Sequence, residues 1–259
     1  MRPMLLARPA RIPDGIVTIA VGGATFGGSG KTRVAIDIAK GFVDQGRSVV
    51  LIGHAYRAKP GRARIVRVDD PIEEVGDEAL VCAAAVTTVV APSRQRAIDF
   101  ACMLDRRPEV LVFDGPLQLS PDRASLSVLA VDAHEPWGLV PRARPSTLLA
   151  AADVVVEVDA RPDPRDLERI RGKTIGLFTA LGRPRRLVRA LAREGIFPSV
   201  VVEARDHGPA PRLPDVRVDL WVATEKCALH LMRRKLSAEL LVLRATPTWA
   251  ALTPLDVRP

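Results

Sequence analysis

Short apolar runs rich in β-branched residues alternate with segments of helical periodicity along most of the chain. The runs predict buried strands, and apolar residues three or four positions apart predict the helices between them. Strands and helices that alternate in this way indicate a mostly parallel sheet flanked by helices on both faces. In the first part of the chain the predicted strands are 16–21, 49–52, 65–68, 88–90, 110–113, 126–132 and 154–158, and the predicted helices lie within 31–45, 77–85 and 93–104.

The stretch 160–171 is rich in proline and charge and predicts a linker between two domains. Beyond it, a second and shorter alternation predicts a smaller α/β domain. Its predicted strands are 174–179, 200–203, 220–223 and 240–243, and its predicted helices are 184–194 and 228–234. The whole chain is therefore expected to consist of an irregular N-terminal arm (1–14), a first α/β domain (15–160), a smaller C-terminal α/β domain (172–245) and a loosely held tail (246–259).

The first predicted strand leads directly into a glycine-rich turn and a helix, in the run IVTIAVGGATFGGSGKT at residues 16–32. Such a loop lets backbone N–H groups approach phosphate oxygens, and the helix N-terminus behind it adds a favourable dipole. In this pattern the lysine reaches the β and γ phosphates of a nucleotide, and the hydroxyl after it ligates Mg²⁺. One position departs from the strict pattern, since Thr25 stands where a glycine is usual. The run predicts a P-loop NTPase-type fold whose nucleotide site contains Thr25, Phe26, Gly27, Gly28, Ser29, Gly30, Lys31 and Thr32.

Polar residues also follow other predicted strands. Asp114 ends the apolar run at 110–113, the position at which phosphate-loop enzymes carry a carboxylate that holds Mg²⁺ directly or through water. The segment 53–61 follows another strand and is either a contact for phosphates or substrate, or a polar surface turn. The candidates in this segment are His54, Tyr56 and Arg57. Asp77 and Glu78 lie at the start of the predicted helix 77–85, where acidic residues are commonly only caps or partners of the helix dipole.

Composition narrows the class of protein. The 259 residues carry a net charge of +8, which suits nucleic acid, anionic lipid or a phosphorylated substrate, or simply reflects genomic base composition. The three cysteines have no paired spacing, which argues against disulfides and a zinc site. No apolar run reaches the roughly 18 to 20 residues that a membrane-spanning helix needs, and the N-terminus lacks a secretory signal. The protein is therefore expected in the cytoplasm.

Five segments, taken in order, resemble the motifs of one family, the tetraacyldisaccharide 4′-kinases of lipid A biosynthesis. They are VGGATFGGSGKT at the loop, VGDEAL around Asp77, FDGPLQL around Asp114, ARDHGPA around His207 and ATEKCALHL from Ala223. Each motif alone is weak, but their order and spacing cover most of the chain, from about Ile16 to Leu243.

The resemblance implies a kinase that transfers the γ-phosphate of ATP to the 4′-hydroxyl of a tetraacylated glucosamine disaccharide 1-phosphate. Motif by motif, it implies that Lys31 and Thr32 bind phosphate and Mg²⁺ and that Asp114 lies near the metal. Asp77 would be the general base, with His207 hydrogen-bonded to it. The enzyme would work at the cytoplasmic face of the inner membrane, in peripheral contact with anionic lipid, and no nucleic acid partner is expected. The substrate contacts would come from among His54, Tyr56, Arg57, Glu78 and Arg144.

The chain also departs from the family pattern. Phe113 stands where the paired-aspartate motif has its first aspartate, Leu119 where it has its histidine, and Cys227 where an aspartate follows a lysine. Two alternatives therefore stay open: a catalytically degenerate relative that binds nucleotide, and a nucleotide-switch ATPase of the partitioning type. Partitioning ATPases usually carry a lysine just before the two glycines, and Phe26 at that position counts against them.

Overall fold

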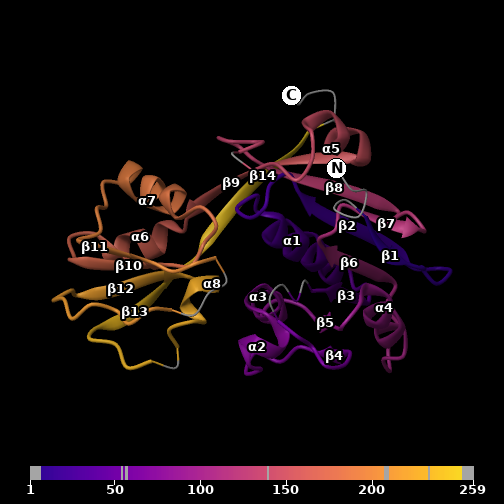
Figure 1. Ribbon diagram of the computed structural model, residues 1–259, viewed down its shortest axis with the longest axis horizontal. Helices are drawn as coiled ribbons and strands as arrows, with labels where there is room; N and C mark the ends of the chain where they lie inside the picture. The colour runs from indigo at the N-terminus through magenta and orange to yellow at the C-terminus, as the bar shows by residue number, and fades with distance from the viewer. Residues whose placement is uncertain are drawn as a thin grey trace. The chain divides into compact units, whose positions relative to one another are not determined.

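The computed structural model describes residues 7–53, 55, 58–138, 140–206, 210–232 and 234–252. The chain divides into two compact units (Figure 1). The larger unit runs to Asp159 and takes in the end of the chain from Trp249, and the smaller unit is Ala160–Thr248. No helix in the described ranges combines the length and the apolar character needed to cross a bilayer.

An eight-stranded sheet forms the centre of the larger unit, with strand order β14-β9-β8-β2-β6-β3-β5-β4. Neighbouring strands from β9 to β5 are parallel, and β4 pairs antiparallel with β5 at one edge. The strands are β2 (Val17–Gly23), β3 (Val49–Ile52), β4 (Arg64–Ile65), β5 (Thr88–Val90), β6 (Val110–Asp114), β8 (Leu126–Asp132), β9 (Val154–Pro162) and β14 (Ala245–Leu252). The predicted mostly parallel α/β architecture is confirmed.

Helices cover both faces of this sheet. Because successive side chains of a strand point to opposite faces, Val112 packs with α1 and α3 on one side and Phe113 packs with α4 on the other. The side chain of Leu148 from α5 packs on the second face, against β8 and β9. The helices of this unit are α1 (Lys31–Asp44), α2 (Ile72–Val75), α3 (Asp77–Ala83), α4 (Arg94–Cys102) and α5 (Pro145–Ala151). The parallel strands place the carboxyl ends of β2 and β6 at the same edge as the start of α1, where ligands bind in such sheets.

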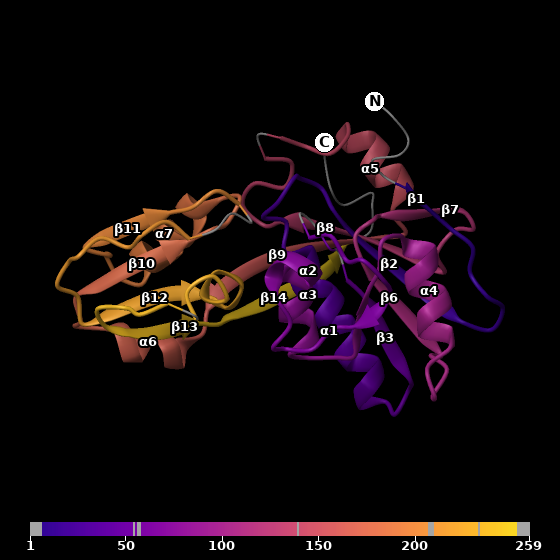
Figure 2. The same ribbon diagram turned by 60° about the horizontal axis from the view of Figure 1, so that its bottom comes forward.

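The smaller unit is built on a second sheet, of four parallel strands in the order β11-β10-β12-β13 (Figure 2). Side chains of α6 and α7 share one hydrophobic cluster on one face of this sheet, while α8 belongs to a cluster on the other face. The elements are α6 (Pro164–Ile170), β10 (Ile175–Thr179), α7 (Pro184–Arg193), β11 (Val200–Glu203), β12 (Leu220–Thr224), α8 (Glu225–Ala228) and β13 (Glu239–Leu243).

Segments near both chain ends form strands where the sequence predicts irregular structure. β1 (Ala7–Ala10) pairs in parallel with β7 (Gln118–Pro121), and β14 joins the large sheet beside β9. The expected arm 1–14 and tail 246–259 are thus wrong for residues 7–10 and 246–252. The prolines that suggested irregularity are tolerated because β1, β7 and β14 all lie at sheet edges, where a missing N–H costs little.

The predicted linker 160–171 is also wrong. β9 continues to Pro162, and α6 begins at Pro164, a position at which proline favours a helix start because the first N–H has no helical partner. The Asp163 carboxylate caps this helix by accepting the N–H of Arg165 at 2.8 Å. Two further segments are shorter or displaced: the strand predicted at 65–68 is reduced to β4, and the helix predicted at 228–234 is the short α8.

Candidate active site

The loop between β2 and α1 is shaped by glycines whose backbone lies in the left-handed region. Gly27, Gly28 and Gly30 have φ angles of 89°, 74° and 78°. Gly30 is required for space as well, because a Cβ atom there would lie 2.7 Å from Val158 Cγ1. The carbonyl of Gly30 then accepts the first helical N–H groups of α1. The strand, glycine turn and helix therefore follow one another as the sequence predicts.

Thr25, the departure from the strict glycine pattern, is accommodated inside the loop. Its side chain is buried, and its hydroxyl donates a hydrogen bond of 2.7 Å to the carbonyl of Gly27. The next residue, Phe26, leaves about half of its surface exposed, at 49%. The threonine thus ties two loop residues together with a bond that a glycine could not make.

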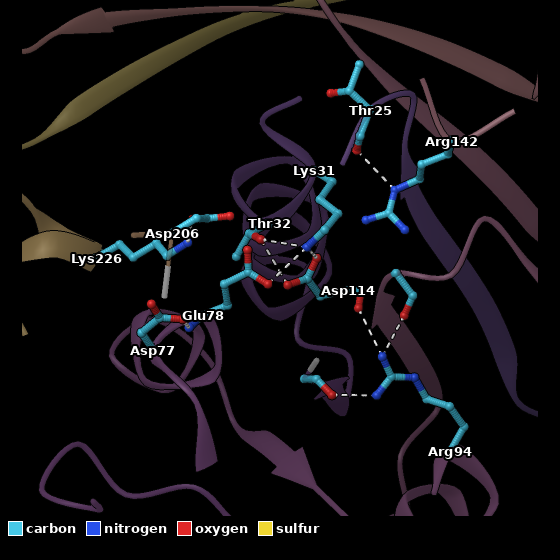
Figure 3. A network of polar contacts seen from close by, with 12 residues as sticks. Thr25, Lys31, Thr32, Asp77, Glu78, Arg94, Asp114, Arg142, Asp206 and Lys226 are labelled. Carbon is cyan, nitrogen blue, oxygen red and sulfur yellow. Dashed lines mark hydrogen bonds and ion pairs between the residues drawn. The ribbon is translucent and has the colours of Figure 1, made fainter. Parts of the chain in front are cut away.

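Lys31, the first residue of α1, lies at the centre of a polar cluster (Figure 3). Its ammonium donates to Asp114 Oδ1 at 2.9 Å and contacts Glu78 Oε2 and Thr32 Oγ1, each at 3.2 Å. The Thr32 hydroxyl donates to the other carboxylate oxygen, Asp114 Oδ2, at 2.9 Å. The structure therefore brings together the predicted phosphate lysine, the predicted metal hydroxyl and the strand-end carboxylate.

The cluster around Lys31 contains more carboxylates than ammonium groups. Asp114 is fully buried and the Lys31 side chain is only 11% exposed, so water screens their interaction weakly. Burial alone would lower the pKa of the Lys31 ammonium, but the charges of Asp114 and Glu78 outweigh burial and raise the pKa above its ordinary value. One ammonium thus faces two carboxylates. The cluster can accept further positive charge beside a loop built for anions.

Asp77 is the first residue of α3 and is almost completely buried. Its Oδ1 atom accepts the backbone N–H of Glu78 at 2.7 Å, so the carboxylate is held at the start of its helix. The side chain of Glu78, the next residue, reaches Lys31. The predicted base therefore stands one residue away from a side chain that contacts the phosphate lysine.

Arg94, at the start of α4, was not predicted as a site residue. Its guanidinium donates to the carbonyls of Gly53 at 2.6 Å, Gly115 at 2.9 Å and Asp114 at 3.2 Å. These bonds link the end of β3 to the end of β6 (Figure 3). Burial lowers the pKa of Arg94 to about 10, although the charge of Asp114 favours the cation. The only sequence signal was an arginine in the first turn of the helix predicted at 93–104, a few residues after the predicted strand 88–90.

Arg142 was also missed, because the resemblance drew attention to Arg144. The Arg142 side chain contacts the backbone of Thr25 and the ring of Phe26. Arg144 is exposed and immediately precedes α5. Its predicted contact with substrate stays a prediction.

The two departures in the paired-aspartate motif share one hydrophobic cluster. Phe113 and Leu119 are buried together with residues of α4, on the sheet face opposite α1. Asp114, one position along β6, faces Lys31 instead. The aspartate that this chain lacks would thus point away from Lys31, into an apolar layer.

Some candidates fall elsewhere. His54, Tyr56, Arg57 and His207 lie outside the described residues. In the smaller unit, the motif residues Asp206 and Lys226 form an ion pair of 3.3 Å. Cys227, another departure, is buried, and its sulfur accepts the N–H of Ala180 at 3.2 Å. The sulfur of Cys227 therefore has a structural partner in the core of this unit.

Known proteins were compared with this chain in sequence and in fold. A kinase named tetraacyldisaccharide 4′-kinase from Azorhizobium caulinodans is 28% identical over 272 residues, covering 90% of this chain and 80% of the relative. The protein of the same name from Dechloromonas aromatica is 26% identical over 290 residues, which cover 98% of this chain and 84% of the relative. The relative from Rickettsia canadensis is 26% identical over 216 residues, covering 74% and 65%.

The fold is shared with a crystal structure of LpxK from Aquifex aeolicus in complex with ATP. The TM-score is 0.70 at 17% identity, and the match covers 96% of this chain and 88% of the other. The family model described as tetraacyldisaccharide-1-P 4′-kinase matches residues 6–156, more than half of the chain and all of the loop, Asp77 and Asp114 region. On this match the chain belongs to the tetraacyldisaccharide-1-P 4′-kinase family.

Proposed function

We propose that the protein transfers the γ-phosphate of ATP to the 4′-hydroxyl of tetraacyldisaccharide 1-phosphate, a step of lipid A biosynthesis. The observation that carries this proposal is the buried cluster of Lys31, Thr32 and Asp114 directly behind the glycine loop. Family membership supports the acceptor, and the ATP complex of the Aquifex fold neighbour supports the donor.

The loop and Lys31 would hold the nucleotide phosphates. Residues 27–30 carry the glycines whose backbone can turn N–H groups toward phosphate oxygens. The charges around Lys31 keep its ammonium protonated, and this charge is the group that can neutralise the β and γ phosphates. Phosphoryl transfer depends mostly on such positioning and charge neutralisation.

Thr32 and Asp114 fit the requirements of a Mg²⁺ site. Their hydroxyl and carboxylate oxygens, 2.9 Å apart, are the hard ligands that Mg²⁺ takes, usually with phosphate oxygens and water completing the set. Within the described ranges no group of three or more His, Cys, Asp or Glu side chains could hold a metal alone. A Mg²⁺ site that uses Thr32 and Asp114 together with nucleotide phosphates agrees with the oxygens present and with the lack of a larger cluster in these ranges. Bound Mg²⁺ would neutralise part of the phosphate charge.

Asp77 is the proposed general base. A carboxylate can accept the proton of the sugar hydroxyl when it lies within hydrogen-bond reach of it. The short side-chain bond to the N–H of Glu78 fixes the carboxylate next to the Lys31 cluster. His207 is proposed as its hydrogen-bond partner on the resemblance alone.

The acceptor is an acylated lipid, so the protein is proposed to act at the cytoplasmic face of the inner membrane. A net charge of +8 favours contact with anionic lipid there. The proposal involves no membrane-spanning segment.

Transfer of radiolabelled phosphate from ATP to the tetraacyldisaccharide 1-phosphate tests the function. Label is expected in the lipid with the wild-type chain and is expected to disappear with Asp77→Asn, while ATP affinity stays unchanged. Glu73→Gln is the matched control, since Glu73 is an exposed acid four residues earlier and should keep full transfer. If ATP binds but no label reaches the lipid, the protein is a degenerate nucleotide-binding relative. If Asp77→Asn transfers normally, Asp77 is not the base.

A further inference from the structure

A segment distant in sequence is paired with the first half of the phosphate loop. The N–H of Phe26 donates to the carbonyl of Val140 at 3.2 Å, and the N–H of Arg142 donates to the carbonyl of Ala24 at 2.9 Å. The residues between these partners form an antiparallel bridge. The backbone of residues 24–26 is therefore fixed from outside the loop.

The Arg142 side chain adds two contacts to the same residues. Its Nε atom donates to the carbonyl of Thr25 at 3.0 Å (Figure 3). Its guanidinium carbon lies 4.8 Å from the centroid of the Phe26 ring. The first contact is a charge-assisted hydrogen bond and the second is a cation–π contact. One side chain thus restrains two consecutive loop residues.

These contacts fix the orientation of one peptide group. The carbonyl of Thr25 is bound by Arg142, and the N–H of the same peptide group, on Phe26, is bound by Val140. Both polar atoms of this peptide are therefore satisfied by the segment 140–142. The following residues, 27–30, are the ones whose N–H groups can turn toward phosphates. The second half of the loop leads directly into α1, whereas the backbone of residues 24–26 is held by the Ala24 N–H bond to the carbonyl of Ala130 in β8 and by the segment 140–142.

We propose that Arg142 is a positioning residue for ATP: it holds Thr25 and Phe26 so that the loop is already in its phosphate-binding shape before the nucleotide arrives. The inference rests on the proposed function insofar as that function assigns ATP to this loop. Preorganisation of this kind raises affinity because the loop loses less conformational freedom on binding. Arg142 acts through the loop and also places a positive charge beside a site for an anion.

Nucleotide affinity without acceptor lipid is the direct test. With a fluorescent ATP analogue and Mg²⁺, Arg142→Ala is expected to raise the dissociation constant about tenfold, the loss typical of one charge-assisted hydrogen bond. Arg67→Ala is the matched control, because the Arg67 side chain is 75% exposed and far along the chain from the loop. If Arg142→Ala binds the analogue as tightly as the wild type, the inference is wrong.

Two further variants distinguish positioning from charge alone, and they decide the question even if Arg142→Ala does not fold. Arg142→Lys keeps the charge but lacks the planar group that bonds Thr25 and covers Phe26, so its affinity should stay well below wild type. Phe26→Leu should weaken binding about threefold by removing the cation–π contact. Wild-type affinity in Arg142→Lys would contradict the inference.

Coupling between the two side chains gives the sharpest test. In the double variant Arg142→Ala with Phe26→Leu, the loss of affinity should be no larger than in Arg142→Ala alone, because Arg142→Ala already removes the cation–π contact through which Phe26 acts. Additive losses would show that they act separately and would overturn the inference. In steady-state kinetics, positioning predicts a raised KM for ATP with kcat nearly unchanged.

The affinity test separates this inference from the proposed function. If the wild type binds ATP in an Arg142-dependent manner but transfers no phosphate to the lipid, the kinase proposal fails and the role of Arg142 stands. If transfer is normal and Arg142→Ala binds ATP normally, only the role of Arg142 fails.

Discussion

Two fully buried aspartates, one in each unit, are held in opposite ways. Asp166 in the smaller unit accepts three hydrogen bonds from Arg244: two from the guanidinium at 2.7 and 3.0 Å and one from the backbone N–H at 3.0 Å. Asp114 in the larger unit is bound by Lys31 and Thr32, two different residues of the phosphate loop region. Lys31 also serves a second carboxylate, Glu78.

The difference separates a structural carboxylate from one available for chemistry. The donors of Asp166 belong to Arg244, a residue of the smaller unit for which the sequence predicts no role in phosphate or metal binding, so we interpret this pair as structural. The donors of Asp114 are the side chains predicted to bind phosphate and Mg²⁺, so their bonds can be exchanged for bonds to a ligand. A buried carboxylate therefore indicates a functional site by the nature of its partners rather than by burial alone.

Among the variants that compare these two aspartates, Asp114→Asn is expected to have the largest effect. The amide keeps the shape of the side chain but removes the negative charge proposed to hold Mg²⁺, so phosphate transfer should fall about a hundredfold or more. Thermal unfolding should change little, because Lys31 still has Glu78 as a partner. Single-turnover label transfer measures the rate of phosphate transfer, and calorimetry of the same sample measures the thermal unfolding. Wild-type transfer in this variant would place Asp114 among the structural carboxylates.

A smaller effect, on a different quantity, is expected from Asp166→Asn. The Arg244 guanidinium loses its carboxylate, and the free energy of unfolding of the smaller unit should drop by about 2 kcal/mol. Transfer by the folded protein should stay near wild type. Denaturant unfolding followed by tryptophan fluorescence reports on this unit when Trp137 and Trp249 are replaced by Phe in both chains compared, because the remaining Trp221 is fully buried in β12. A loss of transfer as large as that of Asp114→Asn would remove the distinction between the two aspartates.

The smallest expected effect is a pH dependence of the smaller unit. Hydrogen bonds from the Arg244 side chain hold the pKa of Asp166 below its ordinary value in the folded state. A carboxyl with a depressed pKa contributes stability above its unfolded-state pKa, about 3.9, and loses it as the pH falls through the lower folded-state value. Unfolding of the smaller unit should therefore become easier below about pH 4. Below about pH 4 the free energy of unfolding should change less with pH in Asp166→Asn than in the wild type. An equal change in both proteins would show that Asp166 is not the source of the pH dependence.

Much of the fold follows from local pattern. The observed bounds of β3, β5, β8 and β11 coincide with the predicted runs. For β3, β5 and β8 the reason is that strands buried inside a parallel sheet are mostly apolar and therefore clearly bounded. β1 and β14 could not be predicted in this way. They are edge strands containing proline, and they exist because of pairing partners far away in the sequence.

The candidate site also contains residues that the sequence predicts and residues that it does not. The glycine loop, Lys31, Thr32 and Asp114 were predicted because a contiguous motif and a strand end mark them. Arg94 and Arg142 were not, because each binds mainly backbone carbonyls of distant segments. Any carbonyl accepts such a bond, so no side-chain pattern in the sequence marks the partner.

The bond between Asp163 and Arg244 bears on how the chain reaches its topology. The N–H of Asp163, just after β9, donates to the carbonyl of Arg244, just before β14, at 2.9 Å. Since β9 and β14 are neighbours in the large sheet, residues 163–244 form an insertion whose two ends are tied together at its base. Loop-closure entropy grows only with the logarithm of length, so joining these strands through roughly eighty residues costs about 3 kcal/mol more than a four-residue turn would. A chain in which a short turn replaces 163–244 would keep every strand of the larger sheet.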